Sequence, residues 1–192
     1  MNFLEFVFFL CYLLSVALVL AKIDIIQSDY GEEKCSSSEA KLLDKKFYGE
    51  LCGGENVLPM IEWIDNNNMT KSYIITLSSI DNSNIVYHLL AWNIPSYINI
   101  INKFSIFDEN KSQVGINTFN KKNYHGPCYA STNTEHTGCL KLTLYALKKE
   151  KIELSDDADY HELMSYLRAM SRKENIIIDA ISMYSVFIPQ KI

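Results

Sequence analysis

The chain has 192 residues, a length that suits one well-buried domain and is too short for two. Hydrophobic residues make up 48% and charged residues 21% of the sequence, proportions that exclude a chain disordered throughout. The formal net charge of −5 argues against broad electrostatic binding to nucleic acid or to an anionic membrane, so an anion site has to be a local feature.

The N-terminal segment is an almost unbroken apolar run over residues 3–21, interrupted only by Glu5. It ends in Val19-Leu20-Ala21, with small residues at the −3 and −1 positions of a cleavage site, which predicts a secretory signal peptide at residues 1–21. The alternative is an uncleaved membrane anchor, because the run is just long enough to cross a bilayer. In both cases the folded part enters the secretory pathway and is secreted or membrane-anchored.

Cysteine usage fits that compartment. Beyond the leader the chain carries Cys35, Cys52, Cys128 and Cys139, an even number that predicts disulfides in an oxidising environment. Four cysteines allow three pairings, and proximity in the sequence favours Cys35–Cys52 with Cys128–Cys139. The alternatives are four free buried thiols or a zinc site; the metal is disfavoured because no close Cys-x-x-Cys pair occurs.

The first half of the chain predicts strands. Residues 22–50 are polar and mixed, and we interpret them as an N-terminal extension with a short helix near residues 39–47, ahead of a domain at residues 51–192. β-branched and aromatic residues then predict strands at residues 57–64, broken by Pro59, at residues 72–77 and at residues 85–92.

The second half of the chain predicts further strands and two helices near the C-terminus. Residues 95–113 show no clear periodicity, residues 115–119 are expected to form a short strand, and the alternation over residues 140–147 predicts another. After the helix-start signal at residues 155–157, Leu163, Leu167 and Met170 form one apolar stripe of a helix. A second helix is expected at residues 173–182 and a closing strand at residues 183–188, so the pattern is that of a mainly antiparallel β protein with late helices.

Several polar residues could line a small anion site, although each also has an ordinary structural explanation. His88 lies in an apolar strand, where a lone histidine is commonly a satisfied core group; His136 lies in a polar loop. Asp81 fits a loop carboxylate, and Gly126-Pro127 fits a turn. Two imidazoles beside the backbone N–H groups of a glycine turn are nevertheless suitable donors to an anion.

The order of seven short motifs gives these residues a context. They are Gly54-Glu55-Asn56-Val57-Leu58-Pro59-Met60-Ile61-Glu62-Trp63, Thr70-Lys71-Ser72-Tyr73, His88, Trp92-Asn93-Ile94-Pro95, Tyr124-His125-Gly126-Pro127-Cys128, His136 and Tyr145-Ala146-Leu147. With the tail over residues 166–184, this order resembles the phosphatidylethanolamine-binding protein (PEBP) family, which includes Raf kinase inhibitor protein-like members. The resemblance spans residues 52–187. It implies a mainly β fold in which a central antiparallel sheet packs on a second, smaller sheet, with C-terminal helices.

The same resemblance implies a shallow pocket for phosphate-like groups, including the headgroup of phosphatidylethanolamine. By motif position it is lined by His88, Gly126, Pro127 and His136, with Asp81 on the mouth loop. The chain also departs from the family pattern. Ser79 stands where the family has the first acid of an Asp-Pro-Asp loop, and Thr137-Gly138 replaces the Arg-Tyr after the second histidine.

We therefore expect a secreted, non-catalytic binding protein that recognises a phospholipid headgroup or another phosphorylated small ligand and needs no cofactor. No nucleophile elbow, zinc-binding His-Glu-x-x-His or phosphate-binding Gly-rich loop is present to suggest an enzyme. The alternative, since relatives bind kinases or inhibit proteases, is a protein-interaction regulator with a degenerate pocket, whose partner is a protein kinase or a protease.

Overall fold

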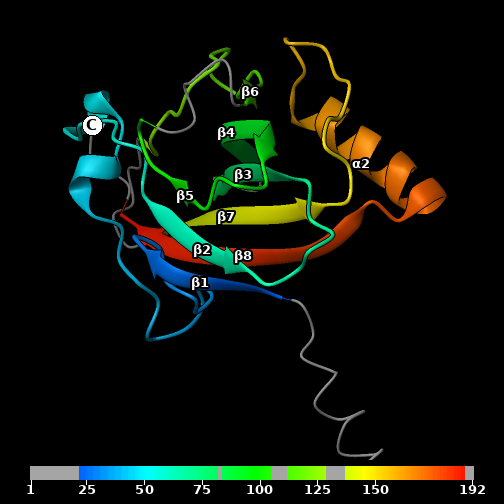
Figure 1. Ribbon diagram of the computed structural model, residues 1–192. Helices are drawn as coiled ribbons and strands as arrows, with labels where there is room; N and C mark the ends of the chain where they lie inside the picture. The colour runs from blue at the N-terminus through cyan, green and yellow to red at the C-terminus, as the bar shows by residue number, and fades with distance from the viewer. Residues whose placement is uncertain (1–21, 82–83, 105–111, 129–136, 189–192) are drawn as a thin grey trace, which may run out of the picture.

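The computed structural model describes residues 22–81, 84–104, 112–128 and 137–188 (Figure 1). In chain order the elements are β1 (Ile23–Ser28), the 3-10 helices Lys45–Phe47 and Glu50–Cys52, β2 (Ile61–Asp65), β3 (Ser72–Asp81), β4 (Asn84–Pro95), β5 (Ile100–Ile101), β6 (Gln113–Val114), β7 (Gly138–Leu147), α2 (Tyr160–Glu174) and β8 (Ile177–Phe187). The strands form a five-stranded sheet, β6-β4-β3-β7-β8, and a three-stranded sheet, β1-β2-β5. Every strand pair is antiparallel, as the sequence predicted.

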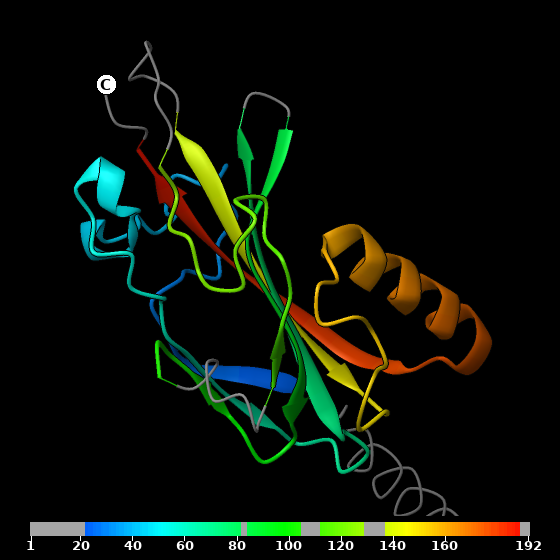
Figure 2. The ribbon, with the colours of Figure 1, turned by 90° about the horizontal axis from the view of Figure 1, so that it is seen from above.

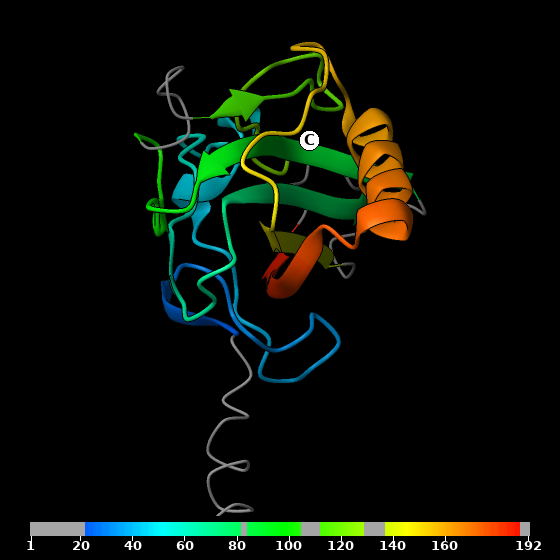
Figure 3. The ribbon, with the colours of Figure 1, turned by 45° about the vertical axis from the view of Figure 1, so that its right-hand side comes forward.

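The large sheet is covered on both faces, with the small sheet on one side and α2 on the other (Figures 2 and 3). Successive residues of a strand point to opposite faces, so β3 sends Ile75 and Leu77 into the core shared with the small sheet and Ile74 into the core beneath α2. Leu89 and Leu90 of β4 divide in the same way. Burial on both faces explains why these strands read as nearly continuous apolar runs.

Helix α2 confirms the predicted stripe, with Leu163 and Leu167 buried against the sheet. A capping box begins the helix, in which the side chain of Asp159 accepts from the N–H of Glu162 and the Glu162 side chain accepts from the N–H of Asp159. Asn175, in the left-handed conformation, ends it. The second helix predicted at residues 173–182 is wrong, since residues 177–187 form β8, which pairs with β7 along its whole length. The C-terminal part therefore contributes one helix to the fold rather than two.

The segment 22–50 contributes to the same fold. Strand β1 pairs with β2, and Ile23, Tyr30, Leu43 and Phe47 are buried in the core between the sheets. The helix expected near residues 39–47 is reduced to the 3-10 turn Lys45–Phe47. The structure thus includes this segment in the domain expected to begin at residue 51. The signal peptide predicted at residues 1–21 lies outside the described residues and stays a prediction.

Two other predicted strands have different bounds in the structure. The strand expected at residues 57–64 is β2, Ile61–Asp65, and the strand expected at residues 115–119 is replaced by the two-residue β6, Gln113–Val114. Within the described part of the chain, no helix is long and apolar enough to cross a membrane.

All four cysteines beyond the leader form disulfides, but both pairings favoured by proximity are wrong. The bonds are Cys35–Cys139 and Cys52–Cys128, with sequence separations of 104 and 76 residues. Residues 31–43 run beside β8, as the bridge of Leu42 to Val186 shows, and β8 lies next to β7, which carries Cys139. The pairing therefore follows the strand order of the sheet and not the distance along the chain.

Candidate functional site

His88 lies at an irregularity in the β3–β4 pair. Leu77 pairs with Leu89, whereas the next residue, Ser78, pairs with Tyr87, so His88 is the extra residue of a β-bulge. Bulges redirect a side chain and are frequent beside functional sites. The ring of His88 is fully buried, with 0% of its surface exposed.

Both ring nitrogens of His88 have partners. Nδ1 lies 2.6 Å from the carbonyl oxygen of His125, and Nε2 lies 2.7 Å from the hydroxyl of Ser79. Because a carbonyl oxygen can only accept, Nδ1 carries the proton, and in the neutral ring Nε2 accepts from the Ser79 hydroxyl. Burial lowers the pKa of His88 to about 4, the hydrogen bond to His125 opposes this, and the neighbouring His125 adds to the lowering. His88 is therefore a neutral imidazole at pH 7.

The segment Gly126-Pro127 is held beside His88. The N–H of His125 donates to the carbonyl oxygen of His88 at 3.1 Å, so each of these two residues bonds the other. The N–H of Gly126 donates to Oδ1 of Asn56 at 2.7 Å. A Cβ at Gly126 would lie 2.3 Å from the carbonyl oxygen of Phe47, so the position has room only for glycine. His88 and the Gly126-Pro127 segment, two of the predicted parts of the pocket, therefore lie side by side. The N–H of Gly126, however, already donates its hydrogen bond to Asn56.

The other two predicted residues are less closely defined. Asp81 is the last residue of β3, pairs with Asn84 across the hairpin and follows Ser79 by two residues. Its side chain, like the whole of His136, lies outside what the structure describes. The roles of Asp81 and His136 in a pocket stay predictions.

His125 is a residue that the sequence analysis did not assign to the site. Its ring packs on Phe119 with 3.9 Å between ring centroids, and the ring of Phe119 lies 5.9 Å from that of His88. Partial burial lowers the pKa of His125, Lys121 lowers it further and Glu50 raises it. The signal was present in the sequence, since His125 directly precedes Gly126 in the motif, but nothing there indicated that its ring stacks near His88.

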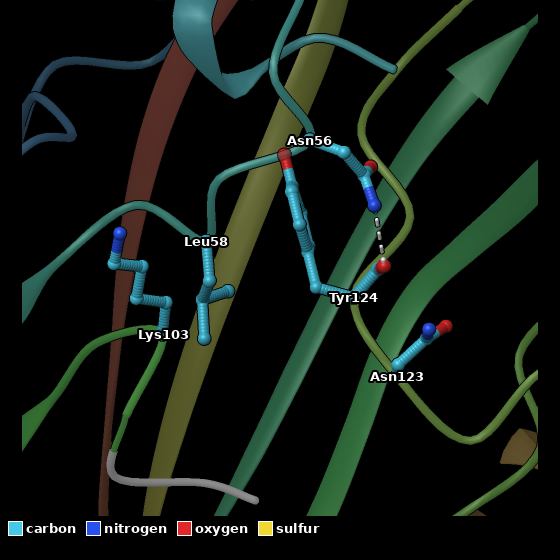
Figure 4. Close-up of a pocket in the computed structure, with 5 residues that line it drawn as sticks. All are labelled: Asn56, Leu58, Lys103, Asn123 and Tyr124. Carbon is cyan, nitrogen blue, oxygen red and sulfur yellow. Dashed lines mark hydrogen bonds between the residues drawn. The ribbon is translucent and has the colours of Figure 1, made fainter. Parts of the chain in front are cut away.

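An open pocket of about 290 Å³ lies close to this segment (Figure 4). Its lining residues come from three separate loops and are Asn56, Leu58, Lys103, Asn123 and Tyr124. None of them was among the predicted site residues. Among the described residues, no group of three or more His, Cys, Asp or Glu side chains could hold a metal ion.

The family model of the phosphatidylethanolamine-binding proteins matches residues 34–178, more than half of the chain. The chain belongs to this family. This PEBP member has the fold of two solved structures. One is YbcL of E. coli, described as a new member of the mammalian PEBP family, at 19% identity with a TM-score of 0.67, covering 89% of this chain and 98% of that one. The other is the PEBP homologue CT736 of Chlamydia trachomatis D/UW-3/CX, at 14% identity with a TM-score of 0.63, covering 86% and 97%. No curated protein matches the chain.

Replacing Ser79 with Asp should restore a charge that the family motif carries and raise the pKa of His88. A carboxylate close to Nε2 favours the protonated ring, by about 1–3 pH units for a close ion pair. An NMR titration of the His88 ring in the wild type and in Ser79→Asp measures this. Thr143→Asp, on the neighbouring strand β7, is the control, and an unchanged His88 pKa in Ser79→Asp would contradict the position of residue 79 beside Nε2 of His88.

Proposed function

We propose that this PEBP member is a non-catalytic binding protein for a phosphate-bearing small ligand, with the headgroup of phosphatidylethanolamine as the first candidate. The pocket would be formed by Ser79, His88, Gly126-Pro127 and His136, with Asp81 at its mouth. The observation that supports this is the pair of hydrogen bonds between His88 and His125, which holds the Gly-Pro segment against the buried imidazole. Family membership supports ligand binding in general.

The charge of the His88 ring is expected to depend on whether a ligand is bound. At neutral pH both nitrogens of His88 are engaged within the protein, with Nδ1 as the donor, so the neutral ring has no second N–H for an anion. A phosphate placed beside the ring favours the imidazolium form, whose Nε2–H is then a charge-assisted donor. Binding is therefore expected to be accompanied by uptake of a proton.

The compartment is part of the same proposal. Two disulfides, each joining distant parts of the chain, are compatible with an extracellular protein. We infer that the chain works in the secretory pathway or outside the cell, where it meets lipid headgroups of the outer leaflet or soluble phosphate esters.

A second candidate function is a protein-interaction regulator that acts on a kinase or a protease. Two features favour it: the N–H of Gly126 already donates to Asn56, and His88 is neutral with both nitrogens engaged. A pocket whose donors are satisfied internally binds a phosphate less readily, whereas the surrounding surface would still be available to a protein.

The test is a calorimetric titration of the full chain, expressed in a secretory host, with phosphorylethanolamine, inorganic phosphate and ethanolamine. We expect saturable binding of phosphorylethanolamine. The affinity should be at least about tenfold weaker in His136→Ala, because this variant loses one charge-assisted hydrogen bond to the ligand. His161→Ala, an exposed histidine on α2, is the matched control. The binding enthalpy should change with the ionisation enthalpy of the buffer if a proton is taken up.

Each arm of this titration separates two interpretations. Equal affinity for inorganic phosphate would show that the site recognises phosphate and not the ethanolamine part. Absence of binding by a folded protein would contradict the ligand-binding proposal and favour the protein-interaction alternative. That alternative is then tested by capture of a kinase or protease partner, compared between the wild type and Asp81→Asn.

A further inference from the structure

The loop between β2 and β3 carries an acceptor sequence for N-linked glycosylation, Asn68-Met69-Thr70, with a residue other than proline in the middle. Oδ1 of Asn67 accepts from the N–H of Met69 at 2.9 Å, and the carbonyl oxygen of Asn67 accepts from the N–H of Thr70 at 3.2 Å. Asn68 and Met69 are therefore the two central residues of a β-turn. Both are exposed, so the turn presents the acceptor asparagine at the surface.

The side-chain amide of Asn68 has no role in holding this loop together. Among the described residues it takes part in no hydrogen bond. Its neighbour Asn67, in contrast, fixes the loop, because its N–H donates to Oδ1 of Asp65 at 2.8 Å and its side chain accepts from the N–H of Met69. A substituent on Nδ2 of Asn68 would therefore break no hydrogen bond of the described structure.

Thr70 supplies the hydroxyl that the acceptor sequence requires. In the part of the chain that the structure describes, Oγ1 of Thr70 is buried and has no hydrogen-bond partner. A buried hydroxyl without a partner costs stability, and valine has a similar shape without that cost. The fold thus gives no reason for a hydroxyl at this position. Recognition before folding does give one, because glycan transfer takes place on the extended chain, in which Thr70 is still accessible.

We propose that Asn68 is N-glycosylated as the chain passes through the secretory pathway, with an oligosaccharide joined to a lipid diphosphate as the donor. Nδ2 of Asn68 attacks the anomeric carbon of the first sugar, and the bond from that carbon to the diphosphate oxygen breaks. The lipid diphosphate leaves with the bonding electron pair, and the amide nitrogen loses one proton to a base of the transferase. The proposal rests on the compartment inferred above and does not depend on a ligand at His88.

A glycan on Asn68 would lie far from the His88 site. Strand β3 starts directly beyond this loop, and the distance from Ser72 to Ser79, the partner of His88, is about 24 Å in an extended strand. Figure 2 shows the β2–β3 loop at one end of the large sheet and the β3–β4 hairpin at the other. Modification of Asn68 therefore leaves access to the proposed ligand site unchanged.

The experiment expresses the full chain, with its own residues 1–21, in cultured mammalian cells. The secreted protein is treated with a peptide N-glycosidase in heavy-oxygen water, which converts a glycosylated asparagine to labelled aspartate. We expect faster electrophoretic migration after treatment, and peptide mass spectrometry should find the label at position 68. Asn68→Gln and Thr70→Val should both lose this label, whereas Thr70→Ser, which keeps a hydroxyl, should retain it.

Asn66→Gln is the matched control, because it changes an exposed asparagine of the same loop outside the acceptor sequence, and it should keep the label at position 68. Asn110→Gln removes the other acceptor sequence of the chain, Asn110-Lys111-Ser112, so a migration change that persists in this variant arises at Asn68. Thr70→Val should be at least as stable to denaturant as the deglycosylated wild type. A lower stability would contradict the argument that the fold does not use the hydroxyl.

Two outcomes would overturn the proposal in different ways. Secreted protein with both disulfides and no label at position 68 would overturn the glycosylation of Asn68 and leave the inferred compartment standing. Protein retained in the cytosol with free thiols would overturn the compartment and this modification together.

Discussion

Replacing Cys52 and Cys128 together with serine is expected to lower the free energy of unfolding by about 2–5 kcal/mol. The bond closes a loop with a sequence separation of 76 residues, for which the chain-entropy estimate is about 4.5 kcal/mol at 25 °C. It also connects the 3-10 helix Glu50–Cys52 to the Gly126-Pro127 segment. Losing it therefore destabilises the fold and also releases one side of the proposed pocket.

Denaturant unfolding under non-reducing conditions measures the change. The double variant Cys35→Ser with Cys139→Ser, which opens a loop with a separation of 104 residues, should lose a similar amount, because the entropy of loop closure grows slowly with length. Peptide mapping without reduction supplies the control. Recovery of a Cys35–Cys52 peptide would contradict the pairing, and a loss below about 1 kcal/mol in both variants would contradict the stabilisation.

The sequence predicted the centre of the fold and misjudged its edges. Strands β3, β4 and β7 have β-branched, aromatic or alternating residues in runs long enough to be recognised. Strand β1 was missed because it has only one buried face and a burial pattern with a single fully buried residue, Ile23. Three of its six residues are isoleucine, but the polar residues that follow β1 make the segment as a whole look like an extension.

Strand β8 shows a different limit. The helix before it ends at Asn175, without a glycine or a proline, so no strong stop signal separates it from the residues that follow. Those residues become a strand because β7 offers a partner over its full length, a tertiary contact that no local window contains. The disulfide pairing was beyond prediction for the same reason, since it depends on which strands are neighbours.

For the candidate site, sequence order predicted which segments lie together but not the chemistry of their side chains. The motifs placed His88 and Gly126-Pro127 together, and the structure does bring them together. The state of His88 depends on a bulge, on a partner carbonyl and on Ser79, all of which follow from the strand register. The sequence showed that Ser79 replaces an acid. It could not show that this hydroxyl is the partner of the buried ring.

The buried imidazole of His88 should make the protein sensitive to acid. Its pKa is about 4 in the folded protein, against about 6.5 in the unfolded chain, so the unfolded state takes up the proton first as the pH falls. The contribution of this group to stability is fully present above about pH 6.5 and is lost progressively as the pH falls from 6.5 to 4. The full difference corresponds to about 3 kcal/mol.

The measurement is the free energy of unfolding between pH 7.5 and about pH 4.5, by denaturant titration. The wild type should lose about 2–3 kcal/mol over this interval through His88. His88→Gln should be less stable at pH 7.5, because hydrogen bonds to Ser79 and His125 are altered, yet its stability should depend less on pH.

His161→Gln, at an exposed position of α2, is the control and should keep the wild-type dependence of the free energy of unfolding on pH. His125, whose pKa burial also lowers, contributes in the same direction, so His125→Gln is measured separately. An unchanged slope in His88→Gln would mean that this ring is not the neutral, buried group described here, and that the acid sensitivity arises elsewhere in the chain.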